Sequence, residues 1–156
     1  MKTIWKATVC IVAVLLSFSI YSCGDDDDDA KGSVNELIGI WEGVSEDEWV
    51  VEDGEREENY GKDISDERYE LKPDMTFNIQ KKYNNAWQVS ETGKWEFDKN
   101  TVKLIFYYPN DGGYDEEDPD IMKILEFSNS AMVWEYHWKE PGFELYTKQS
   151  LRKITQ

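Results

Sequence analysis

The residues best suited to acid–base chemistry in this chain are His137, its only histidine, and Glu135, two positions earlier in the stretch WEYHW. On an extended strand both side chains project from one face, where a histidine and a carboxylate can exchange a proton with a substrate. The alternation with Trp134, Tyr136 and Trp138 predicts that this face points to solvent. No second histidine, nucleophile elbow or glycine-rich phosphate loop accompanies the pair in the sequence. We therefore predict no catalytic residue and a protein that is not an enzyme.

A second group of reactive side chains is the acidic stretch PNDGGYDEEDPD at residues 109–120. Its carboxylates are candidate oxygen ligands for calcium, namely Asp111, Asp115, Glu116, Glu117, Asp118 and Asp120. Their spacing does not match the EF-hand loop, which needs acidic residues at positions 1, 3 and 5 and glycine at position 6. We predict a solvated loop, with no metal site and no cofactor, and keep calcium binding as the alternative.

Cys23 follows an apolar segment near the start of the chain. Lys2 and Lys6 precede the uncharged run ATVCIVAVLLSFSI at residues 7–20, which is typical of a signal peptide. This run is shorter than the roughly 20 residues that a helix needs to cross a bilayer. The stretch IYSC, residues 20–23, resembles the bacterial lipobox, whose cysteine receives lipid and becomes the mature N-terminus. The resemblance implies a lipoprotein signal peptide at residues 1–22 and lipidation of Cys23; the alternative is an ordinary secretory signal.

The residues after Cys23 are polar or small. The segment GDDDDDAKGS, residues 24–33, contains consecutive aspartates whose charges repel one another and keep it extended. Residues 23–33 are therefore predicted to form a lipidated acidic tether. A cysteine followed by acidic residues also resembles the export signal of surface lipoproteins in Bacteroidota. The resemblance implies an outer-membrane protein held in the membrane by lipid on Cys23 and displayed on the cell surface, with a periplasm-facing position as the alternative.

The rest of the chain, residues 34–156, has the length of one compact domain. With Asp+Glu 33 against Lys+Arg 17, the whole chain carries a formal net charge of −16, which repels nucleic acid and excludes it as a partner. Both cysteines, Cys10 and Cys23, precede this domain, so disulfides, thiolate metal sites and cysteine nucleophiles are excluded from it. Its stability must come from a packed core, for which its many aromatic side chains are suited.

Apolar and polar residues alternate over most of this domain. In WQVSETGKWEF, residues 87–97, the aromatic side chains occupy odd positions, as expected of a half-buried strand. Similar alternation occurs in RYELK, TFNIQK and FELYTK, and turn sequences such as KPDM, YNNA and EPGF separate the segments. About eight short strands at such spacings predict an all-β fold, an eight-stranded antiparallel up-and-down barrel.

The first predicted strand contains Gly39-Ile40-Trp41, which is similar to the Gly-x-Trp signature of lipocalins. With YELKPDMTF, TGKWEFDKNTVKL and FELYTKQSLRKI following in this order, the chain resembles the small lipocalin-like domains of Bacteroidota lipoproteins. The resemblance implies an eight-stranded barrel that can hold a ligand. It also implies a structural role for Gly39, which allows close backbone approach, and for Trp41, which closes one end of the barrel. Arg152, with Lys153 as second choice, is the cation expected over the Trp41 ring.

Strand parity makes seven aromatic residues candidates for binding a ligand inside the barrel: Tyr69, Phe77, Trp87, Trp95, Phe106, Trp134 and Tyr136. An eight-stranded barrel is barely wide enough for side chains, so these rings either fill it or leave a cavity for one small ligand. Lys81 is the cation that parity places inside. Because acidic residues are in excess, a neutral lipid, a sugar or a cation suits the charge better than an anion.

Two functions follow from these alternatives. The first is a non-catalytic binding protein for a small apolar or carbohydrate ligand. The second is a protein-interaction or assembly subunit with a filled core, in which exposed aromatic residues contact a partner protein at the cell surface; the candidates are Trp49, Tyr107, Tyr114 and Trp138.

Overall fold

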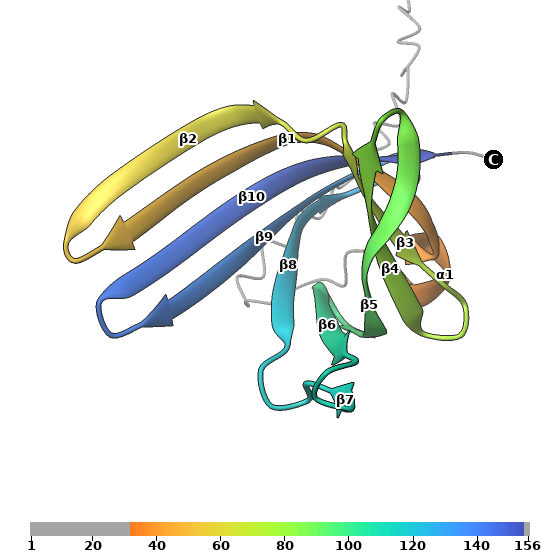
Figure 1. Cartoon of the computed structure of the whole chain (residues 1–156). Coiled ribbons are helices and arrows are strands. Elements are labelled where there is room, and N and C mark those ends of the chain that lie inside the picture. Colours follow the sequence, from red (N-terminus) through yellow and green to blue (C-terminus); the bar gives the residue numbers. More distant parts are fainter. Residues whose placement is uncertain (1–31, 155–156) are drawn as a thin grey trace, which may run out of the picture.

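The computed structural model describes residues 32–154, and the predictions made for residues 1–31, including the lipidation of Cys23, lie outside the described residues. The elements are shown in Figure 1. They are, in chain order, α1 (Val34–Leu37), β1 (Gly39–Glu52), β2 (Glu55–Asp63), β3 (Glu67–Leu71), β4 (Thr76–Tyr83), β5 (Ala86–Asp98), β6 (Thr101–Tyr108), β7 (Gly113–Tyr114), β8 (Asp120–Phe127), β9 (Ala131–Glu140) and β10 (Phe143–Ile154). No helix within residues 32–154 has the length and hydropathy needed to span a membrane.

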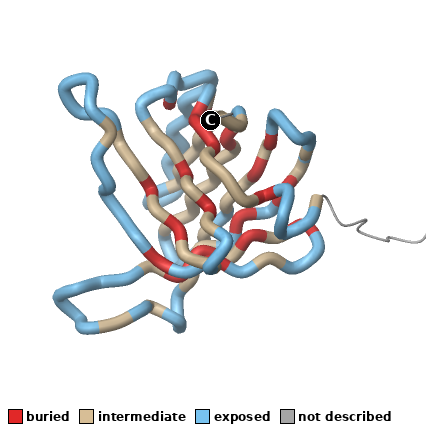
Figure 2. The backbone as a smooth tube through the Cα atoms, turned by 90° about the vertical axis from the view of Figure 1, so that its right-hand side faces the viewer, coloured by how far each residue is buried: buried red, intermediate tan, exposed pale blue. Residues whose placement is uncertain are grey.

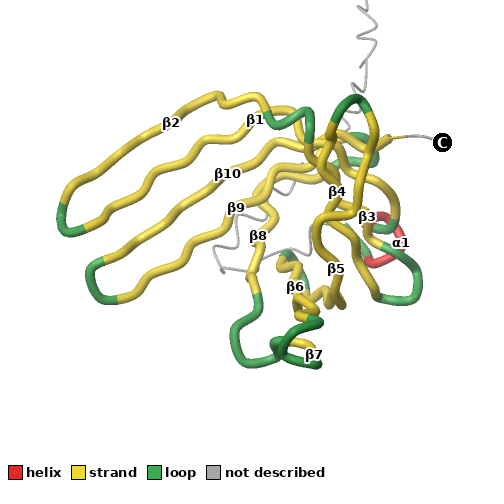
Figure 3. The backbone as a smooth tube through the Cα atoms, viewed as in Figure 1, coloured by secondary structure: helices red, strands yellow, loops and turns green. Residues whose placement is uncertain are grey.

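The strands form a closed antiparallel barrel. Hydrogen-bonded neighbours follow the order β10-β9-β8-β6-β5-β4-β3-β1, and β1 also pairs with β10, which closes the ring. The predicted all-β, eight-stranded up-and-down barrel is therefore confirmed. β2 and β3 both pair with β1 and share the place of one barrel strand, and the short β7 pairs with β6. In Figure 3 the described chain consists almost wholly of strands and their connections.

One end of the barrel is closed by α1 and Trp41. Leu37 and Trp41 are fully buried, and the Trp41 indole Nε1 donates a 2.7 Å hydrogen bond to the Leu37 carbonyl oxygen. Phe127 packs against the Trp41 ring with a centroid separation of 5.9 Å. Gly39 has φ +138°, and a Cβ at this position would lie 2.8 Å from Lys153 Cε. The positive φ favours glycine here, but the nearest group is the flexible Lys153 side chain and not the neighbouring backbone that the Gly-x-Trp resemblance implies.

The cation over the Trp41 ring is Lys153, whose Nζ lies 5.0 Å from the ring centroid. The expectation that Arg152 occupies this position is wrong because of the strand register. Trp41 pairs with Lys153 across β1 and β10, so their side chains share a face, whereas Arg152 pairs with Glu42 on the opposite face. There Arg152 Nε donates to Glu42 Oε1 at 3.1 Å and Arg68 Nε donates to Glu42 Oε2 at 2.8 Å. Burial opposes ionisation of Glu42, but these two guanidinium groups hold its pKa below the usual value.

The hydrophobic core fills the half of the barrel next to α1. Trp95 and Trp134 are fully buried there, and Phe77 is 1% exposed. Gly93 lets β5 pack closely against β6 and the Phe77 ring, because a Cβ would lie only 2.1 Å from the Ile105 carbonyl oxygen and 2.5 Å from the Phe77 ring. Figure 2 shows buried positions along the barrel strands and exposed hairpin tips. The core and every barrel strand lie within residues 32–154, so this segment contains a complete folding unit.

Four strands continue beyond the barrel rim. Residues 45–52 of β1 pair with β2 on one side and with β10 on the other, and β9 pairs with the same part of β10. We call residues 47–63 and 137–146 the sheet extension; its long hairpins project away from the barrel in Figure 1. β2 is the last strand of the hydrogen-bonded order, so it forms the edge of this extension.

Candidate functional site

Two β-bulges determine which side chains enter the barrel beyond the core. In β1, Val44 is the extra residue, since Gly43 and Ser45 oppose consecutive residues of β10. Val44 is 46% exposed, and beyond it the even-numbered residues face inward, beginning with the buried Glu46. In β5, Ser90 is the extra residue opposite β4. Each bulge adds one residue to its strand, so the inward-facing residues change from odd to even numbers, or from even to odd, on passing it.

The bulge at Ser90 places Trp87 outside the barrel. Trp87 pairs with Lys82 rather than with an inward-facing residue of β4. The Arg68 guanidinium lies 3.8 Å from the Trp87 ring centroid, on the outer surface of the sheet. The expectation that Trp87 lines the interior is therefore wrong, because simple alternation does not take account of an extra residue in the strand.

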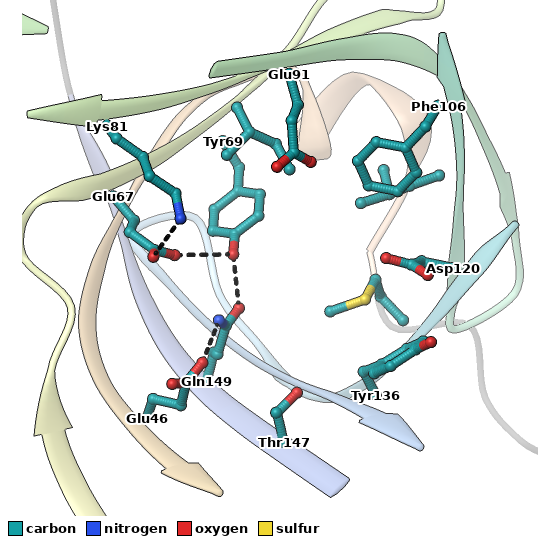
Figure 4. A pocket seen from close by; sticks show the side chains of 13 residues that line it. Glu46, Glu67, Tyr69, Lys81, Glu91, Phe106, Asp120, Tyr136, Thr147 and Gln149 are labelled. Carbon is teal, nitrogen blue, oxygen red and sulfur yellow. Dashed lines mark hydrogen bonds and ion pairs between the residues drawn. The ribbon is translucent and has the colours of Figure 1, made fainter. Parts of the chain in front are cut away.

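The half of the barrel opposite α1 contains a cavity of about 210 Å³, shown in Figure 4. Every barrel strand contributes to its lining, which consists of Glu46, Glu67, Tyr69, Ile79, Lys81, Glu91, Leu104, Phe106, Asp120, Met122, Tyr136, Thr147 and Gln149. On one side β6 and β8 are paired only over residues 101–104 and 120–123, so the end of β6 that carries Phe106 separates from β8. The barrel is thus filled at one end and open at the other.

A buried amide, Gln149, organises the floor of the cavity. Its Oε1 accepts hydrogen bonds from the Trp134 indole Nε1 at 2.8 Å and from the Tyr69 hydroxyl at 3.1 Å. Its Nε2 donates to Glu46 Oε2 at 2.7 Å. Burial raises the pKa of the Tyr69 phenol well above its usual range, so the hydroxyl stays protonated as a donor. These hydrogen bonds connect four strands and hold the Tyr69 side chain in place at the floor of the cavity.

One wall of the cavity carries carboxylates that are already neutralised. Glu46 Oε1 lies 3.0 Å from Lys62 Nζ, and this hydrogen bond raises the pKa of Lys62. Glu67 Oε1 lies 3.4 Å from Lys81 Nζ. Lys81 therefore points inward, as its parity predicts, but its charge is taken by a neighbouring carboxylate rather than offered to a ligand.

The opposite wall carries Glu91 and Asp120. Neither carboxylate has a cationic partner among the described residues. Burial raises the pKa of Asp120, although a hydrogen bond with Tyr136 acts in the other direction. Burial and the charge of Asp120 raise the pKa of Tyr136 to about 12, so the phenol remains neutral at physiological pH.

The seven aromatic candidates fall into three groups. Tyr69, Phe106 and Tyr136 line the cavity. Phe77, Trp95 and Trp134 belong to the core beneath it, with Trp134 also supporting Gln149, and Trp87 lies outside. The two sequence alternatives, a filled barrel and a cavity, thus each describe one half of the same barrel.

Apart from Lys81, the charged and amide side chains that line the cavity were not predicted to face inward. Glu91 has the parity of Trp95, and Asp120 that of the buried Met122 and Ile124, so alternation alone could have identified both. For Glu46 the inward direction depends on the bulge at Val44, for which the sequence gives no signal.

The remaining candidates for chemistry lie away from the cavity. His137 faces outward, as predicted, and its Nε2 lies 2.8 Å from Glu144 Oε1 rather than beside Glu135, which accepts a hydrogen bond from the Tyr146 hydroxyl. In the acidic connection between β6 and β8, the Asp118 backbone N–H donates to Asp115 Oδ1 at 3.2 Å. Within residues 32–154 no group of three histidine, cysteine, aspartate or glutamate side chains is arranged to hold a metal ion.

A closed antiparallel barrel with a cavity at its open end is the architecture of lipocalin-like domains. Residues 37–134 match the lipocalin-like domain family, and this chain belongs to that family. No curated protein matches the sequence. Similar solved structures include a lipocalin-like protein from Bacteroides uniformis (15% identity, 76% of this chain and 99% of that chain covered, TM-score 0.46) and an uncharacterized protein from Bacteroides eggerthii (12%, 75% and 98%, TM-score 0.48). A third is a bovine odorant binding protein in complex with its natural ligand (12%, 82% and 77%, TM-score 0.41).

Proposed function

We propose that this protein is an outer-membrane lipoprotein, displayed on the cell surface, whose barrel binds one small apolar or carbohydrate ligand without transforming it. Lipid on Cys23 anchors the chain, and the acidic residues that follow keep the barrel away from the membrane. The barrel is the binding module, since the mouth of an eight-stranded barrel is a common site for one small molecule.

The observation that carries this proposal is the contrast between the two halves of the barrel. Trp95 and Trp134 fill the half near α1, whereas Phe106 and Tyr136 are only partly buried and border the cavity. A cavity of about 210 Å³ is smaller than the roughly 300 Å³ at which drug-sized sites begin. The cavity therefore suits a small molecule, or the end of a longer one that continues along the sheet extension.

Native mass spectrometry tests the binding proposal. Residues 32–156, purified from cells without refolding, are offered a lipid extract and an oligosaccharide extract separately, and we expect a 1:1 adduct with one of them. Phe106→Ala should weaken adduct formation about tenfold, because it removes a ring from the wall of the cavity. Trp87→Ala is the matched control, since this ring lies outside. A mass that neither extract changes would contradict the proposal.

A separate experiment tests the anchor. In cells given labelled palmitate, Cys23→Ala should abolish labelling of the protein and release it from the membrane fraction or leave an unprocessed precursor. Protease added to intact cells should degrade the native protein if it is displayed on the surface. Labelling that survives the substitution would refute the lipoprotein assignment, and resistance to protease would favour a periplasm-facing position.

A second candidate function, protein interaction, is favoured by the outer face of the sheet extension. Trp49 stacks on Tyr146 with a centroid separation of 5.5 Å and an interplanar angle of 14°, and Arg56 lies 4.5 Å from the Trp49 ring centroid. Ordered aromatic and arginine side chains of this kind are typical of interface hot spots. If this surface binds a protein, Trp49→Ala should abolish capture of the partner while Phe106→Ala leaves it unchanged.

A further inference from the structure

The cavity has an uneven distribution of charge. Its two neutralised carboxylates, Glu46 and Glu67, lie on one wall with their lysines. Glu91 from β5 and Asp120 from β8 point into the space beside Phe106, as Figure 4 shows. Burial raises the pKa of Asp120, and the charges of Asp118 and Glu91 add to this effect, so Asp120 lies in a region of excess negative charge. A positive charge between Glu91 and Asp120 would relieve this repulsion.

The aromatic rings beside these carboxylates can also bind a positive charge. A cation over an aromatic face is attracted by the charge distribution of the ring, and this protein uses such contacts elsewhere, for example with Lys94 Nζ 4.0 Å from the centroid of Tyr114. Within residues 32–154 no lysine or arginine lies over Phe106 or Tyr136. Both rings border the cavity, where a ligand can contact them, and Phe106 also packs against Phe77 and Tyr108 at centroid separations of 5.3 Å and 6.4 Å.

We propose that the ligand of this cavity is a small organic cation, an ammonium group on an apolar body, held between Glu91 and Asp120 and against the rings of Phe106 and Tyr136. This inference rests on the proposed function, because it specifies the charge of the ligand in the same cavity. An anionic ligand is disfavoured, since Lys81 is the only cation of the lining and Glu67 already neutralises it.

Three probes with one scaffold test the inference: 4-phenylbutylamine, 4-phenylbutanol and 4-phenylbutanoate. Their binding to residues 32–156 is measured by calorimetry at neutral pH and low salt. We expect the amine to bind about tenfold more tightly than the alcohol, as one partly desolvated charge interaction allows, and the carboxylate to bind most weakly. The shared phenylbutyl group separates the contribution of charge from that of apolar contact.

Charge-removing variants assign the effect to the two carboxylates. In the double variant Glu91→Gln and Asp120→Asn, we expect the preference for the amine over the alcohol to fall to within about twofold, while affinity for the alcohol is retained. Retained alcohol binding also shows that the cavity is intact. Glu126→Gln, an exposed position on β8 outside the cavity, is the matched control for a change in net charge. If the double variant fails to fold, Glu91→Gln alone should lower the preference at least threefold.

The outcomes distinguish the two proposals. Equal affinities for amine and alcohol, or an equal loss of preference in Glu126→Gln, would overturn the inference about charge and leave the proposed function standing. Failure of all three probes to bind would overturn the inference about charge, while the proposed function would still be decided by native mass spectrometry with the two extracts. A preference for the amine that disappears only in the cavity variants would support both.

Discussion

Replacing Gln149 by leucine should destabilise the barrel by removing the hydrogen bonds that organise the cavity floor. Gln149 is 6% exposed, and its amide is bonded to Tyr69, Trp134 and Glu46. Leucine has a similar size but neither accepts nor donates a hydrogen bond. The substitution therefore leaves buried polar groups without their partner instead of creating a large void.

The magnitude follows from what each partner can do afterwards. The Trp134 indole N–H is fully buried and loses its acceptor, which costs about 1–3 kcal/mol. Glu46 keeps its ion pair with Lys62 but loses the hydrogen bond that the Gln149 amide donates to its carboxylate, which costs about 1.5 kcal/mol. The Tyr69 hydroxyl can turn to Glu67 Oε2, 3.4 Å away, at little cost. We expect a loss of about 3 kcal/mol in the free energy of unfolding and a Tm lower by about 10 °C.

Urea unfolding of residues 32–156, followed by tryptophan fluorescence and circular dichroism, measures this loss. Gln88→Leu, an exposed position on β5, is the matched control and should change stability by less than about 0.5 kcal/mol. In a Trp134→Phe background, which lacks the indole N–H, Gln149→Leu should cost about 1–2 kcal/mol less. An equal cost in both backgrounds, or a loss no larger than that of Gln88→Leu, would refute the account of the network.

Three further predictions concern other parts of the barrel. Gly93→Ala should lower the free energy of unfolding by about 3 kcal/mol, because its Cβ would meet a backbone carbonyl oxygen of β6. The control is Gly113→Ala, whose Cβ would have no atom within 4 Å and which should cost less than about 1 kcal/mol. Equal costs in urea unfolding would contradict this. Because the folded-state pKa of Glu42 is lowered, its ionisation stabilises the fold above the unfolded pKa of about 4.5, and this contribution is lost as the pH falls further. Urea midpoints measured between pH 6 and pH 3 should thus change less in Glu42→Gln than in the native protein, and parallel profiles would exclude the effect. Ultraviolet titration against a Tyr136→Phe reference should show the Tyr136 phenol still mostly protonated at pH 11 and more ionised there after Asp120→Asn; an unchanged titration would remove the coupling.

The fold could be predicted from the sequence because the strands with regular alternation carry the core. Phe77, Trp95 and Trp134 face inward as their parity requires, and the Gly-x-Trp sequence marks the closed end. The errors arise where the register decides the direction of a side chain. Arg152 and Lys153 are adjacent, and only the pairing of β10 with Trp41 selects the lysine.

The site was less predictable because a cavity depends on the separation of strands, which alternation does not report. The parting of β6 from β8, and the bulge that turns Glu46 inward, are three-dimensional features without a residue signature here. The sequence predicts one loop for the acidic stretch at residues 109–120, yet its last residue, Asp120, begins β8 and lines the cavity. The ends of a polar stretch can therefore belong to the strands that flank it.

The edge of the sheet extension affects the tendency of crowded copies of the protein to aggregate. A free edge strand offers its backbone N–H and C=O groups as a template on which a neighbouring molecule can add a strand and start aggregation. All nine residues of β2 are exposed, and six are charged: Glu55, Arg56, Glu57, Glu58, Lys62 and Asp63. Burying such charges between two copies would be costly, and the excess of negative charge makes like copies repel. The composition of β2 thus protects a long sheet that could otherwise polymerise.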